Sequence, residues 1–173
     1  MNDSQSARRY ARAIIETAAN TQAVREELTE IVAAFKANPA LLESLSNPGI
    51  PAPNKKAIVA GVFPGLSAPL PRLFEMLIDA ARVALLPEIA MRYRNEWNSR
   101  NNVHAAKVIT AMALDEASAD SVKKAIERAV SGTVEMETRV DSSLVGGLKV
   151  EVDGHLFDGT VKARLKALRQ QLL

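Results

Sequence analysis

Roughly the first hundred residues carry apolar side chains at helical spacing. Val24, Leu28 and Ile31 recur every three or four positions, the pattern of a helix with one buried face. Asn38-Pro39 ends this stretch, because the residue before a proline avoids the α region. All eight prolines lie between residues 39 and 87, so they divide the segment into short helices. We expect six helices, near residues 4–18, 20–38, 40–46, 54–61, 69–81 and 83–100.

The apolar spacing changes from three or four to two beyond residue 102. Val134, Met136 and Val140 alternate with charged residues, as in a half-buried strand. Asp153-Gly154 matches a two-residue hairpin turn, whose central residues both take positive φ. We expect strands near 103–112, 134–140, 148–152 and 156–157, a helix over 115–131 stopped by Gly132, and a last helix capped by Asp158 or Thr160.

These two patterns predict a mainly α fold in two domains. Residues 1–102 form an N-terminal six-helix bundle, and residues 103–173 form a small α/β C-terminal domain. The boundary falls near Asn101-Asn102, where the prolines have ended and the period-2 pattern starts.

Composition narrows the choice of function. The chain has 173 residues, 47% of them apolar and 24% charged, the balance of a soluble globular protein. The net charge of +2 is spread along the chain, whereas a nucleic-acid binder usually clusters its cations. The chain has no cysteine, which excludes disulfides and thiol nucleophiles. We also expect no signal peptide and no membrane-spanning helix, because no apolar run is long enough.

No residue pattern predicts catalysis, a metal or a cofactor. His104 and His155 stand far apart and are expected at the surface, whereas metal-binding helices often repeat their ligands at i and i+4. Gly146-Gly147 lacks the Gly-Lys-Ser/Thr ending of a phosphate loop, so the pair is interpreted as conformational. Ser142-Ser143 has no basic partner that its spacing can justify.

Two helical segments leave a partner interface open as an alternative to plain core packing. The first helix carries alanines around its circumference, such as Ala7, Ala13 and Ala19. Such a helix permits close approach either within the bundle or by a partner helix in a groove. The last helix has an apolar seam that either packs on its own sheet or leaves an edge for docking. The seam consists of Val161, Leu165, Leu168 and Leu172.

Three motifs in the same order resemble one known family. The segment 141–148 (DSSLVGGL), Gly154 and the segment 157–165 (FDGTVKARL) resemble the C-terminal signature of ATP synthase delta subunits. These are the bacterial and chloroplast counterparts of the mitochondrial oligomycin-sensitivity-conferring protein. The segments 7–13 (ARRYARA) and 82–89 (RVALLPEI) are similar to the family's first helix and mid-chain motif. The resemblance thus runs from end to end.

Two positions depart from the family pattern. Thr160 stands where the family usually has serine, and it keeps the capping hydroxyl. Ala81 stands where a glycine or asparagine often precedes the arginine. Because alanine is the best helix former, Ala81 predicts a continuous helical turn where relatives have a looser junction.

The resemblance implies a stator connector without catalytic activity or cofactor. Family members sit on the catalytic head of the F-type ATP synthase, where the helical bundle binds N-terminal segments of the alpha subunits. The binding groove lies between the first and fifth helices of the family. By motif match it implies the following partner-binding residues: Tyr10, Ala13, Leu73, Met76 and Asp79.

The C-terminal domain of the family binds the b-type subunits of the peripheral stalk. By the same resemblance, Gly147, Leu165 and Leu168 form or support this second interface. The implied location is the cytoplasmic face of a bacterial plasma membrane, as a peripheral subunit that meets the membrane only through the complex. The stromal face of a chloroplast membrane is the alternative location.

Two other functional classes compete with the connector. A nucleic-acid-binding helical module is suggested by the pI near 9.0 and by Arg8-Arg9 and Arg12 around Tyr10; such a module would lose affinity steeply as salt rises. A small helical enzyme is the third hypothesis. The absence of cysteine and of a phosphate loop is the evidence against it.

Overall fold

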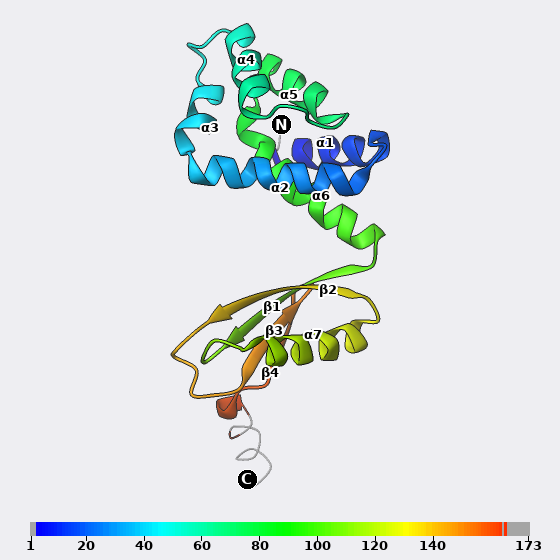
Figure 1. The fold of residues 1–173 in the computed structure, drawn as a ribbon, viewed down its shortest axis with the longest axis vertical. Coiled ribbons are helices and arrows are strands. Elements are labelled where there is room, and N and C mark those ends of the chain that lie inside the picture. Colours follow the sequence, from blue (N-terminus) through cyan, green and yellow to red (C-terminus); the bar gives the residue numbers. More distant parts are fainter. Residues whose placement is uncertain (1–2, 164, 166–173) are drawn as a thin grey trace. The chain divides into compact units, whose positions relative to one another are not determined.

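The computed structural model describes residues 3–163 and residue 165. The chain divides into two compact units, Met1–Trp97 (unit 1) and Asn98–Leu173 (unit 2). The described residues contain seven α-helices, one short 3-10 helix (η1) and four strands (Figure 1). The chain is therefore mainly helical and ends in a small sheet, as the sequence predicts.

The elements of unit 1 are helical throughout the described residues. They are α1 (Asp3–Thr17), α2 (Thr21–Ala37), α3 (Pro39–Ser46), α4 (Ala52–Val62), α5 (Leu70–Asp79), η1 (Val83–Leu85) and α6 (Leu86–Arg100), the last of which runs on into unit 2. The single helix expected over 83–100 is thus wrong in one respect, because its first turn is a separate 3-10 segment. Pro87 still lies in the first turn of α6, where its missing N–H costs nothing.

Unit 1 has one apolar core, to which every one of these helices contributes. Tyr93 and Phe74 are the largest fully buried side chains. The Tyr93 hydroxyl donates a hydrogen bond of 2.9 Å to the carbonyl of Thr21, which satisfies its polar end inside the core. Trp97 is half-buried, and the Arg25 guanidinium lies 4.4 Å from the centre of its ring.

Local sequence signals set several helix ends in this unit. The Asn20 side chain accepts a hydrogen bond of 3.1 Å from the N–H of Ala23 and caps α2. Helix α2 ends at Ala37, directly before Asn38-Pro39, as predicted. Pro69 and Pro71 flank the first residue of α5, where a proline is tolerated because the first N–H groups of a helix have no partner.

The end of α5 contradicts the continuous helical turn expected at Ala81. Ala81 has a φ of 54°, in the left-handed region. Its N–H donates to the carbonyl of Ile78 at 3.0 Å, and the N–H of Arg82 donates to the carbonyl of Leu77 at 2.7 Å. This pair of bonds is a Schellman motif, which ends a helix at a left-handed residue. The left-handed position also accounts for the glycine or asparagine that the sequence resemblance implies at this junction.

Unit 2 is a four-stranded sheet with one helix on one of its faces (Figure 1). Its elements are β1 (Val103–Thr110), α7 (Glu116–Val130), β2 (Thr133–Val140), β3 (Leu148–Val152) and β4 (His155–Asp158). The strand order is β2-β1-β3-β4, with β1 and β2 parallel and the other pairs antiparallel. Helix α7 is the crossover between the parallel strands, and Ile126 on it packs with Val108 and Val150 of the sheet.

Two expectations for this unit need correction. Helix α7 ends at Val130, and its C-cap is Ser131, which takes the left-handed conformation with a φ of 54°; the expected stop at Gly132 is therefore one residue too late. Position 132 instead needs a glycine because a Cβ there would lie only 2.6 Å from the ring of His104. Strand β2 was expected to bury the apolar side chains of one face along its whole length. It does so only near its start, where Val134 is buried, whereas Val140 is 52% exposed; β2 is an edge strand of the sheet.

The hairpin between β3 and β4 forms as predicted. Asp153 and Gly154 have φ values of 49° and 84°, so both central residues are left-handed, as a type I′ turn requires. The Asp153 carboxylate bonds Nδ1 of His104 at 2.5 Å, while Nε2 of the same ring lies 3.3 Å from the amide oxygen of Asn102. His104 is therefore a half-buried structural residue rather than the surface histidine expected, whereas His155 is exposed.

Candidate functional site

The candidate alpha-binding residues lie on two helices that contact each other, α1 and α5. On α1, Tyr10 is half-buried against the core and Ala13 is exposed. On α5, Met76 is 40% exposed and Asp79 lies one turn further along the helix. The fold thus places these four side chains on two neighbouring helices.

Leu73, the fifth candidate, is a core residue. Its exposed fraction is 1%, and it belongs to the apolar core of unit 1 together with Leu77 and Phe74. The spacing of α5 explains this, since the buried residues of the helix recur every three or four positions. Leu73 can support the shape of a partner-binding surface but does not present its side chain there.

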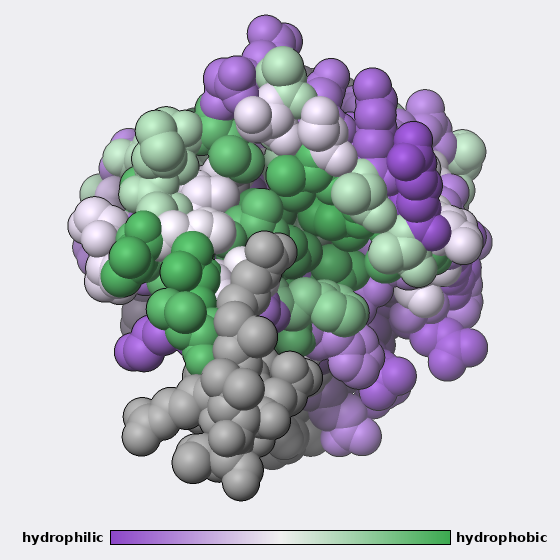
Figure 2. All heavy atoms as spheres, turned by 90° about the horizontal axis from the view of Figure 1, so that it is seen from below, coloured by the Kyte–Doolittle hydropathy of each residue, from purple (hydrophilic) through white to green (hydrophobic). Residues whose placement is uncertain are grey.

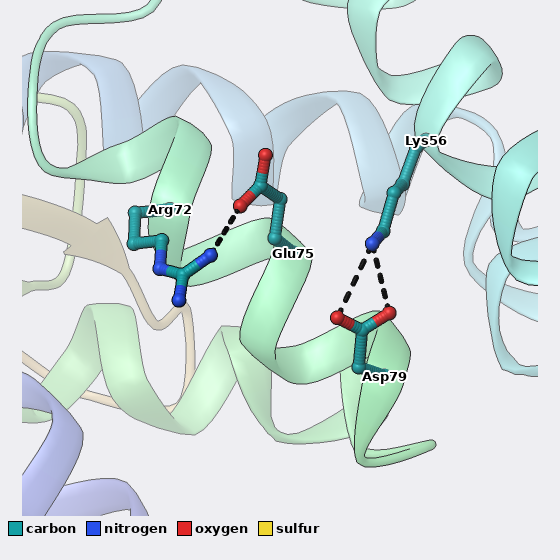
Figure 3. A network of polar contacts seen from close by, with 4 residues as sticks. All are labelled: Lys56, Arg72, Glu75 and Asp79. Carbon is teal, nitrogen blue, oxygen red and sulfur yellow. Dashed lines mark hydrogen bonds and ion pairs between the residues drawn. The ribbon is translucent and has the colours of Figure 1, made fainter.

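Asp79 already has a partner within unit 1. Lys56 of α4 places its Nζ 2.9 Å from one carboxylate oxygen of Asp79 and 3.2 Å from the other (Figure 3). Arg72 and Glu75 form a second ion pair of 2.7 Å within α5. Lys56 carried no signal in the sequence, because the two members of its ion pair are 23 residues apart and no local spacing rule connects them.

A hollow of about 310 Å³ lies between α4 and α5. Its lining is mainly apolar and includes Val59, Phe63, Phe74 and Ile78, with Lys56 among the residues around it. Phe63 and Phe74 stack with their ring centres 6.0 Å apart. Packing between the two helices is therefore incomplete where the hollow lies.

The cations of α1 do not form a patch of one sign. Arg8, Arg12 and Arg92 line a polar hollow of about 520 Å³, together with Glu96. Arg12 pairs with Glu16 at 2.9 Å, and Arg92 also has an acidic neighbour one turn away on its own helix, at 3.4 Å. Because Arg12 and Arg92 each have an acidic partner, part of the positive charge around this hollow is balanced within unit 1.

The Gly-Gly segment of unit 2 is held against the start of the last helical segment. Gly147 has a φ of 81°, and a Cβ there would lie 2.5 Å from the carbonyl oxygen of Gly159. The carbonyl of Gly146 accepts a hydrogen bond of 3.1 Å from the N–H of Val161. These contacts give the glycines a conformational role, which is the close backbone approach that the sequence allows. Gly147 lets its segment approach the Gly159 backbone and has no side chain to contact a partner, so its predicted role at the stalk interface stays a prediction.

Two side-chain caps fix the turn that follows β4. The Asp158 carboxylate accepts a hydrogen bond of 3.0 Å from the N–H of Thr160, and the Thr160 hydroxyl accepts one of 3.2 Å from the N–H of Ala163. Thr160 is therefore the helix cap. The hydrogen bonds from Thr160 stabilise the charged carboxylate and lower the pKa of Asp158 below its ordinary value of 3.8.

Unit 2 exposes an unusual number of large apolar side chains. Figure 2 shows apolar side chains, in green, gathered on the face of the molecule that it draws. Leu165, a predicted stalk-binding residue, is 62% exposed, whereas Leu168 lies outside the described residues. The large exposed apolar residues of this unit are Met112, Val140, Val145, Leu156, Phe157, Val161 and Leu165.

Leu156 and Phe157 were missed as candidate interface residues. They are 62% and 63% exposed on β4, one of the two edge strands of the sheet. Phe157 pairs with Val150, and Leu156 pairs with Glu151, so the two apolar residues point to opposite faces of the sheet. Two consecutive apolar residues in a short strand were the available signal, since an edge strand that ends a sheet rarely buries both faces.

Across residues 3–163 and 165, no three His, Asp or Glu side chains gather where they could hold a metal ion. Within the same residues, no helix combines the length and apolar character needed to cross a bilayer. Several large apolar side chains of unit 2 are exposed, and exposed apolar patches often mark surfaces that contact other proteins.

Comparison with known proteins identifies the family. The model of the ATP synthase delta (OSCP) subunit family matches residues 7–172. The ATP synthase subunit delta of Lactobacillus delbrueckii subsp. bulgaricus is 31% identical over 172 residues, covering 97% of this chain and 96% of its own length. The subunit delta of Myxococcus xanthus is 30% identical over 173 residues, covering 96% of this chain and 95% of its own length.

A solved structure shows the same fold. One chain of the cryo-EM structure of the Toxoplasma gondii mitochondrial ATP synthase hexamer superposes with a TM-score of 0.75 and 17% identity, covering 96% of both chains. Together with the family match, this agrees with the resemblance found in the sequence motifs. The chain belongs to the ATP synthase delta (OSCP) subunit family.

Proposed function

We propose that this chain is a non-catalytic connector in the stator of an F-type ATP synthase. Unit 1 binds N-terminal segments of the alpha subunits, and unit 2 binds the b-type subunits of the peripheral stalk. The connection keeps the catalytic head from turning with the rotor. The observation that carries this proposal is the family match over residues 7–172, which includes both units.

The α1–α5 surface supports the alpha-binding part of the proposal. Its exposed side chains include Ala13, which leaves room for a close approach, and Met76, which offers flexible apolar contact. An amphipathic partner helix can lay its apolar face along such a pair of helices. Asp79 at the end of α5 is ion-paired with Lys56 of α4, which lies beside the apolar residues.

The exposed apolar residues of unit 2 support the stalk-binding part. Phe157 and Leu165 are each more than 60% exposed, and burying either one against a partner contributes about 1.5–3 kcal/mol. A monomeric soluble protein rarely leaves many such side chains in water without a partner. As part of the same proposal, the chain lies at the cytoplasmic face of a bacterial plasma membrane, which it meets only through the complex.

Substitution of Met76 by aspartate tests the alpha-binding surface. Met76→Asp places a charge in the apolar contact, and we expect the affinity for a synthetic alpha N-terminal peptide to fall about tenfold or more. Ala13→Asp should act in the same direction. Tyr10→Asp is a poorer test, because Tyr10 also packs against the core.

Met91→Asp is the matched control for this experiment. Met91 is 50% exposed on α6, so the substitution adds the same charge outside the α1–α5 surface. Titration calorimetry measures the affinities, and circular dichroism checks that each variant stays folded. Equal affinity of wild type, Met76→Asp and Ala13→Asp would contradict the assignment of this surface.

A further inference from the structure

The Lys56–Asp79 ion pair is a polar connection between α4 and α5, and Lys56 also borders the hollow between these helices. Lys56 reaches both carboxylate oxygens of Asp79, at 2.9 and 3.2 Å (Figure 3). The two side chains belong to different helices, whereas the neighbouring Arg72–Glu75 pair lies within α5. The first pair therefore constrains how α4 and α5 lie relative to each other, and the second does not.

The hollow lies next to the Lys56 end of this ion pair, between the two helices that the pair connects. Lys56 borders about 310 Å³ of unfilled space lined by Val59, Phe63, Phe74 and Ile78. Apolar side chains that face a hollow make fewer contacts with the opposite helix than closely packed ones. The ion pair thus supplies a direct polar link between two helices that otherwise meet through apolar side chains such as Phe63 and Phe74.

Helix α5 contacts α4 on one side and α1 on another. Met76 lies three residues before Asp79, so the two side chains are neighbours along α5. A shift of the α5 end toward or away from α4 would therefore move Met76 relative to α1. The proposed alpha-binding surface depends on that separation.

We infer that Lys56 and Asp79 are positioning residues of the alpha-binding surface, and that Asp79 acts through Lys56 rather than by contacting the partner. The inference rests on the proposed alpha-binding function. It assigns a role to Lys56, and it changes the role of Asp79 from the direct contact that the sequence resemblance implies.

Three variants separate positioning from direct contact. Lys56→Met and Asp79→Asn should each weaken binding of the alpha N-terminal peptide by about two- to fivefold. The exchanged pair, Lys56→Asp with Asp79→Lys, should return the affinity to within about twofold of wild type. Direct contact by Asp79 predicts that Lys56→Met strengthens binding by freeing the carboxylate, and that the exchanged pair stays weak. Any pattern other than two weakened single variants and a restored exchange overturns the inference.

Arg72→Met is the matched control, because it breaks an ion pair on the same helix without affecting α4. Its peptide affinity should equal that of wild type. Lys56 and Asp79 are 40% and 55% exposed, so the variants should unfold at nearly the same urea concentration as wild type. A weakened affinity then reports the position of α5 rather than loss of fold.

The methyl NMR signal of Met76 gives a readout that needs no peptide. It should shift in Lys56→Met, whose side chain belongs to α4, and return toward the wild-type position in the exchanged pair. A wild-type protein that fails to bind the peptide would contradict the proposed function, while the Met76 signal still tests the positioning. An unchanged Met76 signal in Lys56→Met would overturn it.

Discussion

Replacing Ala81 by glycine should stabilise unit 1, because Ala81 closes α5 in a conformation that glycine adopts more easily. Its φ of 54° costs an L-residue about 1–2 kcal/mol. Glycine avoids this cost but loses about 0.5–1 kcal/mol more backbone entropy on folding. Ala81 is exposed, so the change removes no core contact. The net gain in the free energy of unfolding should be about 0.5–1 kcal/mol.

Urea unfolding followed by the fluorescence of Trp97 measures this gain. Trp97 is the only tryptophan in the chain and packs on unit 1, so its signal reports that unit. With an m-value of about 1.5 kcal/mol/M, the midpoint should rise by roughly 0.3–0.7 M. Ala57→Gly is the control, since Ala57 is exposed in the middle of α4; it should lower the free energy of unfolding by about 1 kcal/mol. A midpoint for Ala81→Gly at or below that of wild type would refute the reasoning.

Two further predictions concern unit 2. Gly147→Ala should lower the free energy of unfolding by at least about 2 kcal/mol, because the new Cβ would lie 2.5 Å from the Gly159 carbonyl at a positive φ. Gly154→Ala has open space around the new Cβ and should lower it by only about 1–2 kcal/mol. Amide hydrogen exchange in β3 compares the two variants, and equal losses of stability would contradict the steric argument. Asp158 has a lowered pKa in the folded state, so its stabilising contribution is present above its ordinary value of 3.8 and is lost as the pH falls through the folded value. Asp158→Asn should therefore reduce the loss of unit 2 stability below about pH 4 in urea titrations; an unchanged pH profile would contradict this.

The elements that local chemistry specifies could be predicted from the sequence. Asn38-Pro39 ends a helix wherever it occurs in a helical pattern, and Asp153-Gly154 forms the tight hairpin that its residue types favour. The mainly helical fold with a small terminal sheet followed from the change of apolar period. These features depend on a few neighbouring residues, so no tertiary information was needed.

The features that depend on tertiary contacts could not be predicted. Ala81 is a strong helix former that the chain places in a left-handed turn, because the Schellman bonds and the packing of α5 outweigh its propensity. Ser131, and not the adjacent glycine, takes the left-handed conformation that closes α7, whereas Gly132 makes room for the ring of His104. Sequence spacing likewise gave no sign of the link between Lys56 and Asp79.

The candidate site was predicted in part. The resemblance pointed to α1 and α5, and the fold makes these helices neighbours. The resemblance could not tell which of the two apolar α5 residues is buried, because both occupy similar positions in the helical pattern. Leu73 is 1% exposed, whereas Met76 is 40% exposed. It also did not predict the exposure of Leu156 and Phe157, which depends on β4 being an edge strand.

The connector role is tested most directly by a pull-down with the tagged full-length chain from membranes that carry the ATP synthase. One half of the membranes keeps the catalytic head, and the other half is stripped of it at low salt. We expect alpha subunits to co-purify from intact membranes, and b-type subunits to co-purify from both preparations. Recovery of neither alpha nor b-type subunits from intact membranes would contradict the proposed function.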